Sequence, residues 1–211
     1  MSTGETPPRR REPRQMGAII LAAGASTRLG TPKQLLRVDG VAMIVRVVTA
    51  AMDSPLWPIV VVVGSSAAEV RAELARLPVL IAENSAWIEG MASSLRAGIA
   101  TLQSFSRSLD GAVVALCDQP AFTRSTVAQL LEKAPSPLEG RIVAAQYQGR
   151  LGSPALFSRT YFEALSSLSG DAGARHVIST AQTAGHVIPV NLPELAFDLD
   201  TPADFDRLNQ R

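Results

Sequence analysis

A loop of small and cationic residues follows the first apolar segment of the chain. Gly24 and Gly30 are six residues apart, Arg28 lies between them, and Lys33 comes three residues after the second glycine. This spacing fits neither the Walker A loop nor the GxGxxG fingerprint. Small residues let backbone N–H groups approach a phosphate closely, and the two cationic side chains supply charge. The loop therefore predicts a polyphosphate site, with a surface turn that carries incidental charges as the alternative.

Lys33 stands out against the composition of the chain. Of the 20 basic residues, 18 are arginines and only two are lysines. An ammonium group is a compact point charge that can follow a phosphate oxygen as charge shifts, which a planar guanidinium does less well. We therefore expect Lys33 and Arg28 to bind phosphate groups. The residues expected to line this phosphate site are Leu21, Ala22, Ala23, Gly24, Arg28, Gly30 and Lys33.

Carboxylates follow two later segments in positions that suit a hard cation. Asp118 directly follows an apolar run, in the sequence Leu-Cys-Asp-Gln-Pro. Asp198 and Asp200 are two residues apart, so they would share one side of an extended chain. Carboxylate oxygens are ligands that Mg²⁺ prefers. The residues therefore suit a metal site formed by Asp118 together with Asp198 or Asp200. The alternative is that these aspartates cap turns and helices.

The elements that must position these residues can be traced from the apolar pattern. Short apolar runs without polar alternation predict buried strands, and apolar residues at helical spacing predict the helices between them. The expected strands are 17–23, 58–63, 79–82 and 112–116, and the expected helices are 41–52, 66–77, 91–102 and 125–133. This alternation predicts a three-layer α/β fold, with a Rossmann-like, mostly parallel sheet covered by helices on both faces. Ligands of such sheets bind beyond the carboxyl ends of the strands, where the candidate residues lie.

The C-terminal half of the chain is less regular. Strands at 142–146 and 154–157 flank a turn, so we expect a small antiparallel section or a lid-like insertion there. A strand at 187–190 and a closing helix at 202–209 complete the expected elements.

Composition and charge exclude several classes of protein. The chain has 211 residues, a formal net charge of +1, 46% hydrophobic residues and one cysteine. A single cysteine excludes an intrachain disulfide framework and a multi-cysteine zinc site, and the balanced charge argues against a nucleic-acid-binding protein. Because no apolar run is long enough to cross a bilayer, we expect a cytoplasmic protein with no membrane or nucleic-acid partner. We expect a single domain at 16–211 and a disordered basic tail at 1–15, for which weak contact with an anionic surface is the alternative.

The first loop also carries a resemblance to a known family. Its pattern, Leu21-Ala-Ala-Gly-x-Ser-x-Arg-x-Gly-x-x-Lys33-x-Leu-Leu, resembles the signature loop of nucleotidyltransferases with a GT-A-type fold, in particular the MobA-like branch. Within that branch the chain looks most like the molybdenum cofactor cytidylyltransferases, over residues 16–211. The resemblance implies transfer of a nucleotidyl group, above all CMP from CTP, to a phosphate of an acceptor such as the molybdopterin-type molybdenum cofactor, with release of pyrophosphate.

The same resemblance implies roles for the residues already singled out. Arg28, Lys33 and Asp118 would be catalytic, and Asp118 and Asp200 would hold Mg²⁺. It also implies a transient contact with a molybdoenzyme or its chaperone. An acceptor phosphate is already ionised at neutral pH, so its in-line attack needs positioning and charge neutralisation rather than a general base. The sequence shows no Ser-His-Asp or Cys-His constellation, and we expect no metal role for His176 or His186.

A segment in the middle of the chain resembles the nucleotide-recognition segment of the family. It reads Asn84-x-x-Trp-x-x-Gly90-Met-Ala-Ser-Ser94. The resemblance implies that Asn84, Gly90 and Ser94 contact the base or the ribose. Taken by itself, the segment is equally typical of a helix cap beside a core tryptophan.

Two later segments are similar to the acceptor-side segments of the family. They cover 149–157 and 169–175, and the resemblance implies that Arg150 and Arg175 hold an anionic acceptor. The family more often has a glycine and then a histidine or asparagine ahead of the proline, where this chain has Gly152 and Ser153. This departure leaves the identity of the acceptor open.

Three other functions remain compatible with the sequence. A guanylyltransferase or a sugar-phosphate nucleotidyltransferase would keep the chemistry and change the substrates. A glycosyltransferase is suggested by Asp198-Leu-Asp200, which has the form of a DxD metal motif, although that motif normally follows a central strand. A nucleotide-binding module without catalysis would not require both Lys33 and Asp118.

Overall fold

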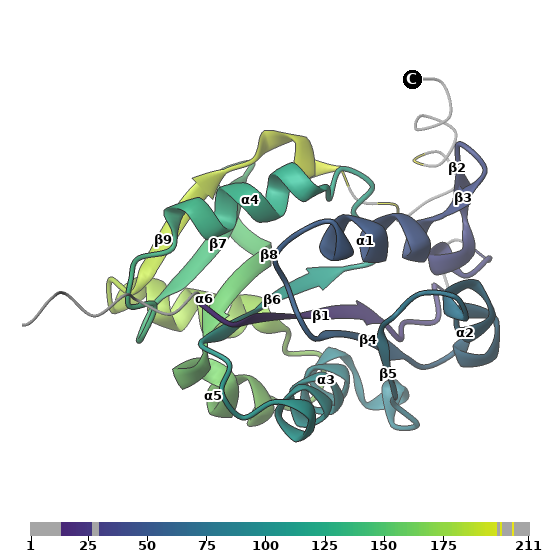
Figure 1. Cartoon of the computed structure of the whole chain (residues 1–211), viewed down its shortest axis with the longest axis horizontal. Helices are drawn as coiled ribbons and strands as arrows, with labels where there is room; N and C mark the ends of the chain where they lie inside the picture. The colour runs from purple at the N-terminus through teal and green to yellow at the C-terminus, as the bar shows by residue number, and fades with distance from the viewer. Residues whose placement is uncertain (1–13, 27–29, 198, 200–203, 205–211) are drawn as a thin grey trace, which may run out of the picture.

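The computed structural model describes residues 14–26, 30–197, 199 and 204, and places them around a seven-stranded sheet with the order β5-β4-β1-β6-β8-β7-β9 (Figure 1). The strands of this sheet are β1 (Met16–Ala22), β4 (Ile59–Val63), β5 (Leu80–Glu83), β6 (Gly111–Leu116), β7 (Ile142–Tyr147), β8 (Arg150–Ser158) and β9 (Val187–Asn191). A separate two-stranded ribbon consists of β2 (Arg37–Val38) and β3 (Val41–Ala42). The strands predicted from apolar runs are all present, with ends that shift by a few residues.

Helices cover both faces of the sheet and so form the outer two of three layers. They are α1 (Met43–Met52), α2 (Ala67–Leu74), α3 (Met91–Phe105), α4 (Arg124–Lys133), α5 (Phe162–Ser166) and α6 (Ala174–Thr183). Buried side chains of α1, α2 and α4 pack in one hydrophobic core, and those of α3, α5 and α6 pack in a second core on the opposite face. Figure 1 shows α1 and α4 above the sheet and α3 and α5 below it. The predicted three-layer α/β architecture is confirmed.

The central strands are apolar at every position because both of their faces are buried. All seven residues of β1 are buried, and Ile20 contributes to one core whereas Ile19 and Leu21 contribute to the other. β4 consists of one isoleucine and four valines, whose β-branched side chains favour extended backbone. Uninterrupted apolar runs of this kind are typical of parallel strands between two helical layers.

β8 is the one strand of the seven that runs against the others. β1 pairs in parallel with β4 and β6, and β4 with β5, whereas β8 is antiparallel to both β6 and β7, and β7 is again parallel to β9. Of the two arrangements expected for the C-terminal half, the antiparallel section is therefore correct, and β8 is part of the main sheet rather than a lid. The chain order reverses between β1 and β6, which makes their carboxyl ends the switch point where such folds bind ligands.

Several elements differ from the prediction. The helix expected at 41–52 begins at Met43, because Val41 and Ala42 pair with β2 across a turn in which Asp39 and Gly40 have φ of 52° and 78°. Positive φ at both central positions is what a two-residue Asp-Gly hairpin turn requires. α5 and α6 were not predicted, and α6 begins inside the segment expected to bind the acceptor. The predicted closing helix at 202–209 lies outside the described residues.

The amino ends of β1 and β6 lie at the edge of the sheet opposite their carboxyl ends. Arg14 donates hydrogen bonds to the carbonyls of Ala134 and Pro135, at 2.9 and 3.1 Å, and the N–H of Gln15 donates to Asp110 Oδ2 at 2.8 Å. These two residues of the predicted tail are thus attached to the domain; residues 1–13 lie outside the described part. In the described part of the chain, no helix has the length and apolar character needed to span a membrane.

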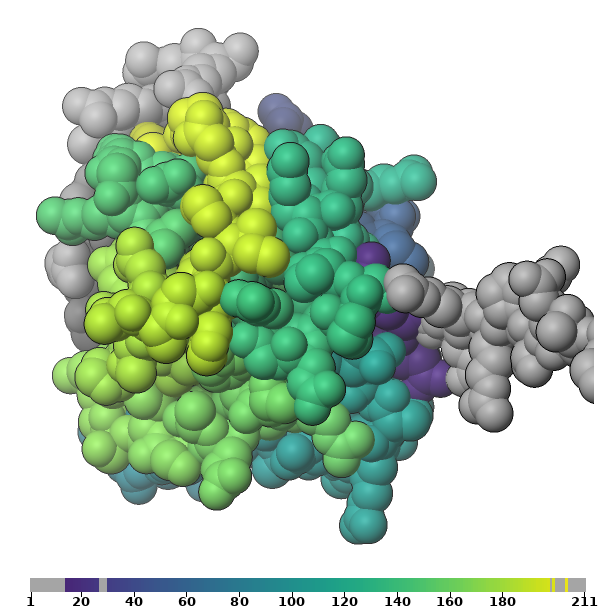
Figure 2. All heavy atoms as spheres, turned by 90° about the vertical axis from the view of Figure 1, so that its left-hand side faces the viewer, coloured from purple at the N-terminus to yellow at the C-terminus, as the bar shows by residue number. Residues whose placement is uncertain are grey.

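The β9 edge of the sheet closes the molecule on the side that faces the viewer in Figure 2. There the yellow residues of the C-terminal strand lie against the teal-green residues of α4. β9 carries Pro189, which has no N–H to offer to a further strand. This edge is therefore poorly suited to pair with another chain.

Candidate active site

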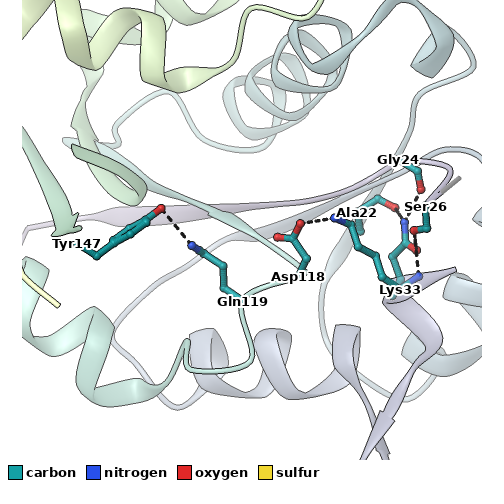
Figure 3. Close-up of polar contacts among 8 residues, drawn as sticks. Ala22, Gly24, Ser26, Lys33, Asp118, Gln119 and Tyr147 are labelled. Atoms are coloured by element: carbon teal, nitrogen blue, oxygen red, sulfur yellow. Dashed lines mark hydrogen bonds and ion pairs between the residues drawn. The ribbon is translucent and has the colours of Figure 1, made fainter. Parts of the chain in front are cut away.

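The loop after β1 and the turn after β6 meet at the switch point of the sheet. Lys33 Nζ donates to Asp118 Oδ2 in an ion pair, and the two side chains are only 19% and 13% exposed. The strands bring them together because β1 and β6 are neighbours, with Leu21 paired to Leu116 in the register. Figure 3 shows the lysine reaching toward the carboxylate from the loop side. The structure thus places two of the predicted catalytic residues in direct contact.

Lys33 is held at the start of a short 3₁₀ helix, Lys33–Leu35. Its N–H donates to Ser26 Oγ at 3.0 Å, across the loop, and Ser26 itself has a φ of 53°. A side-chain oxygen that accepts from a backbone N–H at the start of a helix acts as a cap. The serine therefore fixes the point from which the lysine side chain extends. Arg28, the other predicted cation of this loop, lies outside the described residues.

Gln34 braces the loop from within. Its side chain is fully buried, and Nε2 donates to the carbonyls of Ala22 and Gly24 at 2.8 and 2.7 Å. Ser26 Oγ lies 3.4 Å from Gln34 Oε1 and donates to it. The sequence analysis missed this residue. It could have been found by asking which group satisfies the buried carbonyls of a loop that consists mainly of alanine and glycine.

Replacement of Gln34 by leucine should destabilise the protein and loosen this loop. The substitution removes both hydrogen bonds and leaves the buried Ala22 carbonyl without its side-chain donor, which typically costs about 2 kcal/mol. We expect the free energy of unfolding, measured by urea denaturation, to fall by roughly that amount. Gln129→Leu on α4 is the matched control, because its side chain donates to Ser125 of the same helix rather than to a buried carbonyl of the loop. Equal stability of the two variants would contradict the bracing role.

The end of β4 supports the same loop from the other side. The N–H of Ser65 donates to the Ala23 carbonyl at 3.1 Å, and Ser65 Oγ donates to the Gly24 carbonyl at 3.0 Å. A Cβ on Gly64 would lie 2.7 Å from that Ala23 oxygen, so only glycine allows this close approach. Leu21, Ala22 and Ala23 are buried, whereas Gly24 and Gly30 are exposed. The exposed glycines leave the surface of the loop open.

The predicted nucleotide-recognition residues form a cluster of their own at the end of β5. Asn84 is 6% exposed and donates to Ser93 Oγ and Ser94 Oγ at 2.8 and 3.1 Å, while its Oδ1 accepts from the N–H of Ala86 at 3.0 Å. The amide thus anchors the first turn of α3, and the predicted contact of Asn84 and Ser94 with a base remains a prediction.

Gly90 has a structural requirement that the sequence analysis did not foresee. Its φ is 106°, and a Cβ there would lie 2.5 Å from the Gly170 carbonyl oxygen and from Asp171 Oδ1. The same Gly170 carbonyl accepts from the N–H of Ala92 at 3.2 Å. One N–H of the α3 N-terminus is therefore occupied by the loop that precedes α6.

Arg175 lies close to β8, beside Gly152 and Tyr147. A Cβ on Gly152 would be 3.0 Å from the Tyr147 hydroxyl and 3.6 Å from Arg175 Nη2, so both groups converge over this glycine. Arg150 begins β8 and is exposed. The structure thus brings Arg175 to the strand that carries Arg150.

Asp118 lies in an environment that suits a divalent cation. Its Oδ1 is buried and has no hydrogen-bond partner among the described residues, while its backbone carbonyl accepts from the N–H of Leu199 at 3.0 Å. A buried carboxylate oxygen without a donor is a favourable ligand for Mg²⁺ or Mn²⁺. Asp198 and Asp200 adjoin Leu199 in sequence but lie outside the described residues. In the described ranges, no group of three or more His, Cys, Asp or Glu side chains could hold a metal.

Cys117, next to Asp118, is a buried small residue rather than a reactive thiol. It is 3% exposed, and burial together with the nearby carboxylate raises the pKa of the thiol well above its usual range. His176 and His186 are exposed. The buried Cys117 thiol is therefore poorly suited to act as a nucleophile at this site.

A cavity of about 890 Å³ lies at the opposite end of the sheet. Its lining includes Gln15 and Asp110, which precede β1 and β6, and it contains none of the predicted site residues. The N–H of Gln15 donates a hydrogen bond to Asp110 Oδ2. The described residues of the predicted site therefore lie toward the carboxyl ends of the parallel strands and not in this cavity.

Comparison with known proteins agrees with the geometry. Residues 18–186 match the family of MobA-like NTP transferase domains. The purine catabolism protein PucB of Bacillus subtilis (strain 168) is 28% identical over 207 residues, which cover 91% of this chain and 95% of PucB. The bifunctional protein GlmU of Coxiella burnetii (strain Dugway 5J108-111) is 35% identical over 133 residues, 61% of this chain, but the match covers only 28% of GlmU.

Solved structures give the same result. Rv0371c from Mycobacterium tuberculosis H37Rv has a TM-score of 0.77 and 29% identity, over 95% of this chain and 100% of Rv0371c. A complex of Rv0371c with manganese has a TM-score of 0.73 and 27% identity, over 93% of this chain and 98% of that one. A chain that superposes with this protein over nearly its whole length thus binds a divalent cation.

Proposed function

This chain belongs to the family of MobA-like NTP transferase domains, and on that premise we propose that it transfers CMP from CTP to a phosphate group of an anionic acceptor and releases pyrophosphate. The acceptor that we propose is the molybdopterin-type molybdenum cofactor. CTP and this acceptor follow from the resemblance to the molybdenum cofactor cytidylyltransferases. The observation that carries the proposal is the contact of Lys33 with Asp118 at the switch point of the sheet. It joins a cation suited to phosphate and a carboxylate suited to a metal in one partly buried site.

In the proposed reaction, the acceptor phosphate attacks the α-phosphorus of CTP in line and pyrophosphate leaves. Lys33 and Arg28 bind the β- and γ-phosphates and stabilise the charge of the leaving group. Asp118 and Asp200 hold Mg²⁺, a role supported by Asp118 Oδ1, to which no described residue donates, and by the contact of Leu199 with the Asp118 backbone. When bound, Mg²⁺ neutralises the phosphate oxygens and so lowers the repulsion between the two anionic substrates.

The other predicted residues take supporting roles in the proposal. Asn84, Gly90 and Ser94 lie at the end of β5, the side from which the base and ribose are read. Arg150 and Arg175 bind the acceptor. The two cores of the described residues lie on either face of one sheet, which supports a single domain over 16–211. We extend the proposal to a transient contact with a molybdoenzyme or its chaperone that receives the product.

A pyrophosphate-release assay across nucleotides and acceptors tests this function. CTP, GTP, UTP and ATP are each supplied with Mg²⁺, with and without the molybdenum-loaded cofactor. We expect release only with the cofactor and at least tenfold faster with CTP than with the other nucleotides. Preference for GTP would replace the proposal by a guanylyltransferase, and turnover with a sugar phosphate by a sugar-phosphate nucleotidyltransferase. Sugar transfer from a nucleotide sugar without pyrophosphate would instead support a glycosyltransferase.

A further inference from the structure

The sheet opens between β6 and β8 immediately beside Asp118. β6 pairs with β8 only from Gly111, opposite Ser158, to Val114, opposite Ala155. Beyond that point β6 continues to Leu116, whereas β8 continues toward its start paired with β7, after a register shift between Ala144 and Ala145. Backbone hydrogen bonds therefore do not join the end of β6 to the adjacent part of β8.

The side chain of Gln119 spans this opening. Gln119 is fully buried in the turn after β6, and its Nε2 donates to the Ser153 carbonyl at 3.1 Å and to the Tyr147 hydroxyl at 3.4 Å. That hydroxyl in turn donates to the Ser153 carbonyl at 3.0 Å. Figure 3 shows Gln119 pointing toward Tyr147, away from the side on which Lys33 approaches Asp118. One amide thus connects the turn that carries Asp118 with both strands of the β7–β8 hairpin.

Stability alone does not account for an amide at this position. Gln119 Oε1 is buried and has no hydrogen-bond partner in the described part of the chain. An apolar side chain of similar shape would fill the same space without burying an unpaired acceptor. The useful part of the residue is therefore its donor end, which fixes where the hairpin lies relative to Asp118.

The position of the hairpin matters because of the direction of attack. In an in-line displacement, the nucleophile enters opposite the leaving group. If the loop 24–33 holds the leaving phosphates, the acceptor must enter from the other side of Asp118. On that side lie Gln119, Tyr147 and Arg175, which converge around Gly152 and Ser153. The hairpin is thus the surface against which an acceptor would be aligned.

We propose that Gln119 is a positioning residue, which ties the β7–β8 hairpin to the turn of Asp118 and so aligns the acceptor with the α-phosphorus. This inference rests on the proposed nucleotidyl transfer. Gln119 itself touches no substrate in this proposal; it acts through the Ser153 carbonyl and the Tyr147 hydroxyl. A displacement of about 1 Å in such a support can lower a reaction rate by about a hundredfold.

Gln119→Met tests the tie because methionine has a similar length and no donor. With CTP and the molybdenum cofactor, we expect kcat/KM for the acceptor to fall by about ten- to a hundredfold. The dissociation constant of CTP with Mn²⁺ should stay within about twofold, because the loop 24–33 is unchanged. Tyr147→Phe, which keeps the bond from Gln119 to Ser153, should give a smaller loss. Gln129→Met is the matched control and should behave as the wild type. Equal losses for CTP binding and for the acceptor, or losses equal to those of the control, would overturn the proposal.

Hydrogen exchange gives a measurement that does not depend on turnover. In Gln119→Met, amides of residues 147–153 should exchange at least about tenfold faster, while those of β1 and β4 keep the protection of the wild type. If wild-type protein turns over no nucleotide, the proposed function fails, and the tie is judged by exchange alone. Unchanged protection of 147–153 would then overturn it, as would an equal increase throughout the sheet, which indicates a general loss of stability.

Discussion

Asp118→Asn should lower the rate of pyrophosphate release by about a hundredfold to a thousandfold. The carboxylate suits the cation, and among the described residues no donor reaches its buried Oδ1. An amide of the same shape supplies a neutral oxygen and an NH₂ group that repels a metal. The variant therefore loses the bound cation, whose positive charge neutralises the two anionic substrates. The change is measured at saturating CTP and cofactor, with Mg²⁺ and again with Mn²⁺.

A binding measurement separates this effect from misfolding. Mn²⁺ titrated in the presence of CTP and followed by electron paramagnetic resonance should bind to the wild type and bind much more weakly to Asp118→Asn. Asp39→Asn is the matched control, because Asp39 has an 84% exposed side chain and a positive φ that asparagine also accepts. A folded Asp118→Asn protein that keeps more than half of its activity would remove this residue from the mechanism.

Lys33→Met should have the second largest effect. It should lower kcat/KM for CTP but raise the affinity of the protein for Mn²⁺ in the absence of nucleotide. The substitution removes the cation that contacts phosphate, so we expect kcat/KM for CTP to fall by about a hundredfold. It also removes the ammonium group that pairs with Asp118 in the ligand-free protein. Mn²⁺ without nucleotide should therefore bind several-fold more tightly to the variant than to the wild type.

The opposite signs make this prediction specific. In the wild type, a cation at Asp118 is repelled by the Lys33 ammonium group on the other carboxylate oxygen, and this repulsion falls when a triphosphate offers the ammonium group another partner. Lys33→Arg should not restore the rate fully, since a planar guanidinium does not reproduce a compact charge. Lys133→Met at the end of α4 is the matched control for loss of one positive charge. If the variant binds Mn²⁺ alone no better than the wild type, the exchange of partners is wrong.

The sequence predicted the parts of the site that depend on strand ends. Apolar runs located β1 and β6, and their adjacency in a parallel sheet accounts for the meeting of Lys33 with Asp118. α5 escaped prediction because it has only five residues. α6 was missed although its buried residues, Ala174, Val177, Ile178 and Ala181, have helical spacing, because the segment before it was interpreted only as an acceptor-binding loop.

The partners of the supporting glutamines could not be predicted from the spacing of residues in the sequence, for a different reason. Gln34 and Gln119 act on backbone carbonyls that are near in space, and one of these, Ser153, is 34 residues away in the chain. Such contacts produce no characteristic spacing of residue types in the sequence. Asn84 shows the converse: its type suits recognition of a base, and the structure shows a second use of its amide, which anchors α3. The type of a polar residue predicts that it forms hydrogen bonds, and the fold decides with what.

The burial of Cys117 makes the end of β6 insensitive to thiol chemistry. The only sulfhydryl of the chain is 3% exposed and its pKa is raised, so little thiolate is present for an oxidant or an alkylating reagent to attack. Reaction at this sulfur requires β6 to separate from its neighbours. The rate of alkylation in native buffer therefore reports how often the carboxyl end of β6 separates from its neighbours.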